Sequence, residues 1–289
     1  MVRPKTSESR CVSVFTDEAK LIAKMAPRLR KALIVDPTPA SARLLGDLLR
    51  NISQGQVFTA QTNKRGLEIA SQIDPQIMFV ELSGAGVDGV DFARKVRRGD
   101  MMCRQAPIIV VTSTATAQSI LAARDAGVHE FLRKPYTNKE LVRRLEAVIL
   151  RPRDWIEAVQ YIGPDRRRFN SEDYTGPLKR KSDVRESSDS QRVLQAIRII
   201  KSALPALSSD SAQALRALRA QAADLQKVGV GMSDVALVTE AAELQRILRD
   251  AAETGVLDPP AIAKASLPLL ARLPKDDGAA RGRDQVVML

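Results

Sequence analysis

Five short apolar runs alternate with amphipathic stretches along residues 31–150, and this alternation limits what the segment can fold into. The runs are expected strands at residues 32–35, 56–60, 77–82, 108–112 and 130–132, with amphipathic helices expected at residues 40–50, 64–72, 90–97, 117–125 and 139–150. Each run is short and continuous, as in parallel strands covered on both faces. Strand–helix repeats with right-handed crossovers therefore predict a doubly wound α/β fold with a five-stranded parallel sheet.

Four polar residues stand at or just beyond the ends of these runs. They are Asp36, Glu81, Thr112 and Lys134, which follow the first, third, fourth and fifth strands. Doubly wound sheets include those of flavodoxin-like strand order 2-1-3-4-5, and their ligand sites lie at the carboxyl ends of the strands. We therefore predict that the four side chains converge there, and that Lys134 forms an ion pair with Glu81.

The composition changes after Tyr174, and this change marks a second module. Every aromatic residue lies at or before Tyr174, and the remainder is rich in Ala and Leu. Apolar residues recur every three or four positions in residues 193–204, 215–225 and 238–251, and more weakly in 262–273. This periodicity predicts amphipathic helices that pack as an all-α bundle over residues 191–275. The polar residues 276–289 are expected to form a disordered tail.

Residues 151–190 are predicted to be a linker that contains an imperfect repeat. The repeated positions are Tyr161, Gly163, Pro164, Arg166, Arg167 and Arg168 in the first copy and Tyr174, Gly176, Pro177, Lys179, Arg180 and Lys181 in the second. Gly-Pro disfavours helix and central strand, so each copy is expected to be a turn followed by an extended basic segment. Two interpretations stay open. The copies are paired docking elements, for an anionic partner or for an acidic face of the first module, or they are a solvated basic spacer.

The net charge of +11 is unevenly distributed. Residues 1–31 hold eight Lys and Arg against three Asp and Glu, whereas residues 193–289 hold twelve against eleven. Residues 1–30 are therefore predicted to be a basic arm, with a short helix at residues 17–25. Such an arm attracts anionic surfaces or serves only solubility. Nucleic acid is thus a possible partner, but the near-neutral bundle does not favour it.

Several classes of function lack support in the sequence. The chain has no apolar run long enough to span a membrane and no secretory leader pattern. Its two cysteines show no metal-binding or disulfide spacing, which predicts a reducing, cytoplasmic setting. No Walker, GxGxxG, HExxH or CxxC motif occurs, so no catalytic or metal site and no enzyme activity are predicted. The single histidine, His129, is expected to be a solvent-facing polar residue.

The order of these positions resembles the receiver domain of bacterial response regulators, the CheY-like family. The resemblance rests on residues 31–36, 77–89 and 131–135, and covers about residues 31–150. It implies that Glu81 stands in place of the phosphate-accepting Asp and that Asp36 belongs to the acidic pocket. It implies that Thr112 is the hydroxyl that contacts the phosphoryl group and that Lys134 is the cation that pairs with phosphoryl oxygens. Phe131 would then be the aromatic switch, and Pro135 the often cis proline that follows the lysine.

Two departures from the family pattern point to a degenerate pseudo-receiver. In the family two adjacent acids hold Mg²⁺, but here Pro37 stands in the second place. Glu81 is one methylene longer than Asp, and a misplacement on the order of an ångström can cost about 10²-fold in a positioned reaction. No phosphate uptake, no cofactor and no Mg²⁺ binding are therefore expected. The sequence Gly84-Ala85-Gly86 also predicts a more mobile loop after Glu81.

The function predicted from these features is two-component, or phosphorelay, signal transduction in a bacterium. The receiver would act without phosphorylation, through protein–protein contacts of the linker and the bundle. The resemblance implies histidine kinases or other regulators as partners, with a contact surface near Phe131 and Tyr136. The alternatives are a DNA-binding response regulator, and a sensor that binds an anionic nucleotide second messenger through Arg166, Arg167 and Arg168, since arginine suits phosphate.

Overall fold

The computed structural model describes residues 19–166 and 188–274, which form two compact units. The α/β unit contains residues 19–156 and 161–166, and the helical unit contains residues 157–160 and 188–274. The predictions for residues 1–18, for the second copy of the repeat and for the tail lie outside the described residues.

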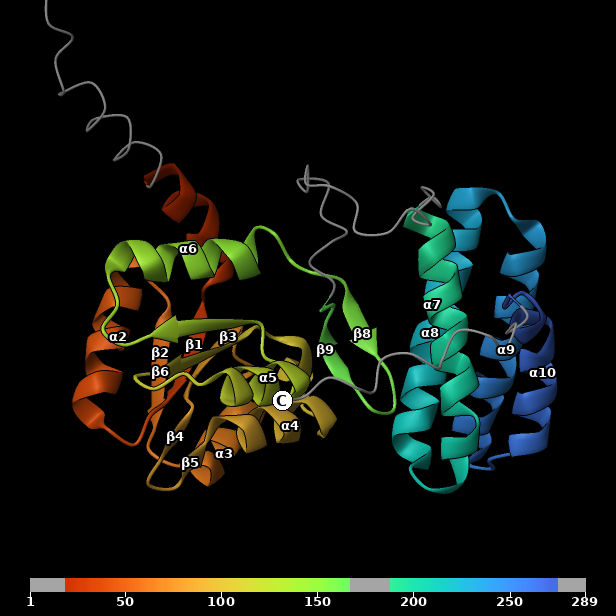
Figure 1. Ribbon diagram of the computed structural model, residues 1–289, viewed down its shortest axis with the longest axis horizontal. Helices are drawn as coiled ribbons and strands as arrows, with labels where there is room; N and C mark the ends of the chain where they lie inside the picture. The colour runs from red at the N-terminus through yellow and green to blue at the C-terminus, as the bar shows by residue number, and fades with distance from the viewer. Residues whose placement is uncertain (1–18, 167–187, 275–289) are drawn as a thin grey trace, which may run out of the picture. The chain divides into compact units, whose positions relative to one another are not determined.

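A five-stranded parallel sheet forms the centre of the α/β unit (Figure 1). Its strands are β1 (Lys31–Val35), β2 (Gln56–Ala60), β3 (Ile77–Glu81), β6 (Ile108–Thr112) and β7 (Glu130–Arg133). They lie in the order β2-β1-β3-β6-β7, and each neighbouring pair is parallel. This is the predicted flavodoxin-like arrangement, and it brings the carboxyl ends of all five strands to one edge.

Helices cover both faces of this sheet. The helices are α2 (Pro39–Ile52) and α6 (Asn138–Ile149) on one face, and α3 (Asn63–Ile73), α4 (Gly89–Arg98) and α5 (Ala117–Asp125) on the other (Figure 1). Alternate strand residues point to opposite faces. Leu33 and Val35 of β1 thus pack towards α3 and α4, whereas Ala32 and Ile34 pack towards α2 and α6. The sheet is buried on both sides, which explains its continuous apolar strands.

The segment before β1 also belongs to the α/β core. Residues 19–25 are helical and are followed by the 3₁₀ turn η1 (Ala26–Arg28). Met25 is 0% and Leu29 is 3% exposed, and both pack in the cluster that α2 and α6 share. The sequence predicted a basic arm over residues 1–30. Its described part is instead a packed element, because its apolar residues cover the edge of this cluster.

Two short two-stranded pieces complete the α/β unit. One joins β4 (Ser83–Gly84) to β5 (Val87–Asp88), and the other joins β8 (Trp155–Glu157) to β9 (Ile162–Pro164). The second piece lies within the predicted linker. Ile162 is 4% exposed, and its burial explains why these residues are folded strand and not a solvated linker.

The helical unit is a closed four-helix bundle. Its elements are α7 (Ser188–Ala203), the 3₁₀ turn η4 (Pro205–Ser208), α8 (Ser211–Met232), α9 (Val235–Thr254) and α10 (Pro259–Ala271). Asp210, Asp234 and Asp258 cap the last three helices at their N-termini. Each helix contacts the next, and α10 returns to contact α7, as predicted for a bundle. Within residues 19–166 and 188–274, no helix is long and apolar enough to cross a membrane.

Buried amides on α8 hold residues 157–160 in the helical unit. Gln213, 1% exposed, donates from Nε2 to Glu157 Oε1 at 2.8 Å and to the carbonyl oxygen of Ala158 at 3.1 Å. Gln221, two turns further along the same face, donates to the carbonyl oxygen of Glu157 at 3.1 Å. These bonds satisfy polar groups that would otherwise be costly to bury.

Candidate functional site at the carboxyl ends of the strands

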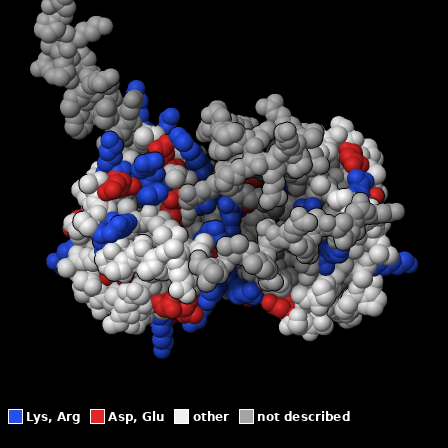
Figure 2. Space-filling model, in the orientation of Figure 1, with Lys and Arg blue, Asp and Glu red and all other residues white. Residues whose placement is uncertain are grey.

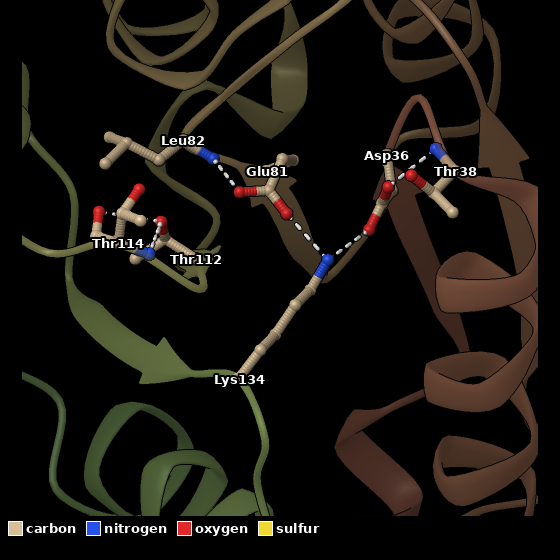
Figure 3. Close-up of polar contacts among 7 residues, drawn as sticks. All are labelled: Asp36, Thr38, Glu81, Leu82, Thr112, Thr114 and Lys134. Carbon is tan, nitrogen blue, oxygen red and sulfur yellow. Dashed lines mark hydrogen bonds and ion pairs between the residues drawn. The ribbon is translucent and has the colours of Figure 1, made fainter.

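Three charged side chains meet where β1, β3 and β7 end (Figure 3). The ammonium Nζ of Lys134 lies 2.8 Å from Asp36 Oδ2 and 2.6 Å from Glu81 Oε2. The expected ion pair between Lys134 and Glu81 is present, and Asp36 is a second partner of the same cation. The result is a triad of two carboxylates bridged by one ammonium.

The backbone fixes the second oxygen of each carboxylate. Asp36 Oδ1 accepts a hydrogen bond from the Thr38 N–H at 2.8 Å, and Glu81 Oε1 accepts one from the Leu82 N–H at 3.0 Å. Glu81 therefore folds back onto its own strand end, and both of its oxygens are engaged. The peptide bond between Lys134 and Pro135 is cis, as the resemblance implies.

The triad is nearly closed to solvent. The side chains of Asp36 and Glu81 are 6% and 10% exposed, and that of Lys134 is 23% exposed. Burial acts to lower the pKa of Lys134, but the hydrogen bonds to Asp36 and Glu81 outweigh it and raise the pKa above its usual value. The lysine is therefore a permanent cation at neutral pH.

Thr112 lies at the same edge but is turned away from the triad. Its hydroxyl donates to the carbonyl oxygen of Thr114 at 3.0 Å and accepts from the Thr114 N–H at 3.1 Å (Figure 3). Phe131 packs, partly buried, against the α3–α5 face of the core, whereas Tyr136 packs against the α2–α6 face. Burial raises the pKa of the Tyr136 phenol. Of the described residues that the sequence predicted for this pocket, only the charged triad is thus joined by direct polar contacts between side chains.

The loop after Glu81 is a hairpin that Asn63 clamps. The strands β4 and β5 pair across a turn in which Gly86 has a φ of +72°. Asn63 accepts from the Asp88 N–H at 3.3 Å through its side chain and donates back to the carbonyl oxygen of Asp88 at 2.8 Å. The Asn63 N–H donates to the carbonyl oxygen of Gly86 at 2.9 Å. The predicted mobile loop thus has a paired backbone, because its glycines supply a tight turn.

The pocket does not fit the Mg²⁺ ion that a receiver resemblance implies. Mg²⁺ requires near-octahedral oxygen ligands, and Lys134 already occupies the space between the two carboxylates. Pro37 offers no side-chain ligand, and its ring packs so closely on Gly84 that a Cβ there would lie 2.5 Å from Pro37 Cγ. Among the residues that the structure describes, no group of three or more His, Cys, Asp or Glu could hold a metal ion.

A second polar cluster, which the sequence did not predict, surrounds Arg97 at the amino ends of β6 and β7. Arg97 is 1% exposed, and burial lowers its pKa to about 9. Its guanidinium lies 3.2 Å from His129 Nδ1, which also accepts from the Ile108 N–H at 3.3 Å. The prediction that His129 faces solvent is therefore wrong. Burial, then the charges of Arg97 and Arg153, hold the His129 pKa well below its usual value.

The first copy of the linker repeat folds against the α/β unit. The Tyr161 hydroxyl donates to the carbonyl oxygen of Pro164 at 2.6 Å, and the Arg166 guanidinium lies 3.6 Å from the centre of the Tyr161 ring. Arg166 also pairs with Asp125 at 2.7 Å. The remaining predicted linker contacts lie outside the described residues: Arg167, Arg168, Tyr174, Lys179, Arg180 and Lys181.

One signal for the Arg97 cluster was present in the sequence. In the helix expected at residues 90–97, Phe92, Ala93 and Val96 form the buried stripe, and Arg97 lies one turn after Ala93 on it. An arginine on an apolar stripe indicates a buried polar contact, although its partners come from distant segments. No comparable signal indicated that Asn63 would clamp the hairpin.

Comparison with known proteins assigns the fold of the α/β unit. The family model of the response regulator receiver domain matches residues 32–146. The transcriptional regulatory protein KdpE of Escherichia coli is 31% identical over 123 residues, 43% of this chain and 52% of KdpE, so the match spans about half of that relative. Chemotaxis protein CheY1 of Helicobacter pylori is 26% identical over 120 residues, 41% of this chain and 96% of CheY1.

Solved structures match the same part of the chain. A response regulator from Chloroflexus aurantiacus is 25% identical, with 42% of this chain and 98% of that chain covered, at a TM-score of 0.39. The strand order, the residues at the strand ends and the match to the family model agree. Residues 32–146 are therefore a response regulator receiver domain of the CheY-like type.

Proposed function

We propose that this chain is a two-component signalling protein whose receiver domain works without phosphorylation, as a pseudo-receiver. Its output would be carried by protein–protein contacts, and not by a phosphoryl group. The proposal concerns the chemistry of the pocket and the partners of the chain, beyond the receiver fold itself.

The observation that carries the proposal is that all four carboxylate oxygens of Asp36 and Glu81 are already bound by Lys134 or by the backbone. Glu81 holds the place of the phosphate acceptor, yet both of its oxygens are bound, one by Lys134 at 2.6 Å and one by the Leu82 N–H at 3.0 Å. Phosphoryl transfer depends on positioning and on charge compensation, mainly by Mg²⁺ and a cation. Here the acceptor is already ion-paired with the cation, and Pro37 offers no side-chain ligand for a metal ion. A carboxylate held in this way is a poor nucleophile for an incoming phosphoryl group.

The same contacts support a receiver held in one state. Lys134 joins the end of β7 to the ends of β1 and β3 through its two ion pairs. The Thr112 hydroxyl is bound to Thr114, so no hydrogen bond links it to Glu81. We therefore expect partners to recognise a fixed surface around Phe131 and Tyr136. Histidine kinases and other regulators of two-component pathways are the partner classes that the receiver fold suggests.

DNA binding is the second candidate, and the relatives favour it. KdpE and BaeR of Escherichia coli are transcriptional regulatory proteins by name, and MtrA of Mycolicibacterium smegmatis is a DNA-binding response regulator. Against it, residues 188–274 hold ten Lys and Arg and nine Asp and Glu. Figure 2 shows basic and acidic residues interspersed on the face that it presents. A nucleotide sensor is less supported, because Arg166 is already paired with Asp125.

Incubation with acetyl phosphate and Mg²⁺, followed by intact-mass spectrometry, tests the main proposal. The parent protein should gain no phosphoryl group, and Glu81→Asp alone should gain little, because the second acid is still missing. The double variant Pro37→Asp with Glu81→Asp restores both acids and is the matched positive control. A phosphoryl group on the parent that maps to residues 32–146 would refute the proposal.

A titration with fluorescent duplex DNA separates the two candidates. A DNA-binding regulator should bind with an affinity that falls steeply between about 50 and 200 mM salt. Absence of such binding at low salt, together with a protein partner recovered by cross-linking on the receiver, would favour the pseudo-receiver.

A further inference from the structure

The Arg97 cluster is a built site at the opposite end of the sheet from the triad. The Arg97 guanidinium donates to the carbonyl oxygens of Gly127 at 3.1 Å and Ala106 at 3.0 Å, to that of Arg104, and towards His129 Nδ1 at 3.2 Å. All these acceptors belong to the receiver domain. The receiver itself therefore holds the cation in position.

One segment lies against this cluster, which we call the strap: residues 154–156 and 161–166, with most of β8 and all of β9. The Arg97 guanidinium lies 5.2 Å from the centre of the Trp155 ring, and the His129 ring is stacked near it at 6.5 Å between centres. A cation over the face of a Trp ring is attracted by it. Trp155 thus lies against two side chains that the receiver positions.

The backbones of strap and receiver meet at two glycines. A Cβ on Gly163 would lie 2.6 Å from the Gly127 Cα, and a Cβ on Gly127 would lie 2.2 Å from the carbonyl oxygen of Ile162. Gly127 also has a φ of +85°, which favours glycine. Both positions therefore require glycine for this approach, which makes the contact specific in shape.

The four recurring residues of the first repeat copy that the structure describes each have a contact in this arrangement. Tyr161 is covered by Arg166 and donates to the carbonyl oxygen of Pro164, Gly163 meets Gly127, and Arg166 pairs with Asp125. The strap thus carries a short motif, Tyr-x-Gly-Pro-x-Arg. Its Gly163 and Arg166 contact the receiver, and its Tyr161 and Pro164 contact each other within the strap. This fit is more than a spacer requires.

We propose that Arg97, Asp125, Gly127 and His129 form a docking site of the receiver for such a segment, and that the strap is its resident ligand, bound in cis. The ligand class is an aromatic segment with a Gly-Pro turn and a trailing arginine. The site is pre-organised, which lowers the cost of binding.

The docked strap can also leave without unfolding the receiver core. The side chains of Arg166 and Asp125 are 32% and 49% exposed, so water weakens their ion pair, whereas two like charges at these positions would repel each other. Strands β8 and β9 pair only with each other and add no strand to the five-stranded sheet, so the strap can open locally at a lower free energy than the core. Because the strap is tethered, its effective concentration is on the order of millimolar, so a modest affinity suffices to keep it docked. A free segment of the same chemistry can therefore compete for the site.

The single Trp of the chain, Trp155, reports on docking in the full-length protein. Gly163→Ala should release the strap, which raises the acrylamide quenching of Trp155 several-fold and speeds hydrogen exchange in β9. Exchange in β6 and α6 should stay unchanged. Gly231→Ala is the matched control, because a Cβ there meets nothing within 4 Å. Unchanged quenching in Gly163→Ala would overturn the proposal.

Recognition in trans is tested with a fluorophore-labelled peptide of residues 154–166, by fluorescence anisotropy. The peptide should bind the Gly163→Ala chain, whose site is vacated, and much less the parent chain. A peptide that itself carries Gly163→Ala should bind neither. Failure of the parent-sequence peptide to bind the vacated chain would overturn the docking site.

A charge exchange keeps the test valid if Gly163→Ala disturbs the whole receiver. Asp125→Arg and Arg166→Asp should each raise Trp155 quenching, and the double variant should restore the parent value. Single variants without effect, or a double variant that stays undocked, would refute the role of this pair and with it the proposed site.

Discussion

Replacing Lys134 with Met tests whether the charged triad stabilises the receiver. The substitution keeps the length of the side chain but leaves Asp36 and Glu81, which are 6% and 10% exposed, without their shared cation. Removing one partner of a buried ion pair costs about 3–5 kcal/mol. Because 23% of the Lys134 side chain is exposed, water will reach the carboxylates, and we expect the lower end of that range.

Urea denaturation followed by hydrogen exchange of the core strands β1, β3 and β6 measures this loss in the α/β unit. With a urea dependence of about 2 kcal/mol/M, a loss of about 3 kcal/mol lowers the midpoint by about 1.5 M. Lys139→Met on the exposed side of α6 is the matched control and should change stability by less than about 0.5 kcal/mol. A Lys134→Met variant within the same limit would refute a triad that stabilises the fold.

Three further changes test a buried histidine, a buried amide and a close packing contact. Below pH of about 6.5, the unfolded chain takes up a proton at His129 that the folded receiver excludes, because burial lowers its pKa. The free energy of unfolding should therefore fall by up to about 1.4 kcal/mol per pH unit, measured by urea denaturation at several pH values. Gln213→Leu should destabilise the helical unit by about 1–3 kcal/mol, because the buried Glu157 loses a donor; thermal denaturation followed by circular dichroism measures this. Gly84→Ala should cost about 1–3 kcal/mol in the urea assay, because its Cβ would meet Pro37 at 2.5 Å.

Each of these changes has a control. His129→Asn keeps an acceptor near the Nδ1 position and should remove this histidine's share of the pH dependence. Gln245→Leu, a glutamine of α9 that is not fully buried, should affect stability much less than Gln213→Leu. Pro37→Ala should relieve the cost of Gly84→Ala. An unchanged pH dependence in His129→Asn would contradict the role of the buried His129. Equal effects of the two glutamine variants would contradict the role of the Gln213–Glu157 hydrogen bond. No relief from Pro37→Ala would contradict the close contact between Gly84 and Pro37.

The sheet and the Lys134–Glu81 pair could be predicted because the sequence encodes them locally. Continuous apolar runs marked buried parallel strands, and the polar residue after each run marked its carboxyl end. Asp36 as the second partner of Lys134 could not be predicted in the same way. That contact depends on how far the lysine reaches across β1 and β3, which spacing along the chain does not give.

The strap was missed for a different reason. Its Gly-Pro step and the charged residues after it predict a turn in a loop. What folds it is a contact between Gly163 and Gly127, which are 36 residues apart, together with the buried Arg97. Tertiary contacts of this kind override local preference, as they also did for His129, whose loop position suggested exposure.

The packing of Met25 and Leu29 has a consequence for fragments of this protein. The receiver family model spans residues 32–146, but both of these side chains, 0% and 3% exposed, lie before it. Cutting at residue 32 would leave the α2–α6 cluster without two apolar side chains, and removing one buried Leu or Met side chain costs about 2–5 kcal/mol. Cutting at residue 146 would also remove Val148, 6% exposed, from the same cluster. A fragment that keeps this cluster fully packed has to begin before Met25 and to end after Val148.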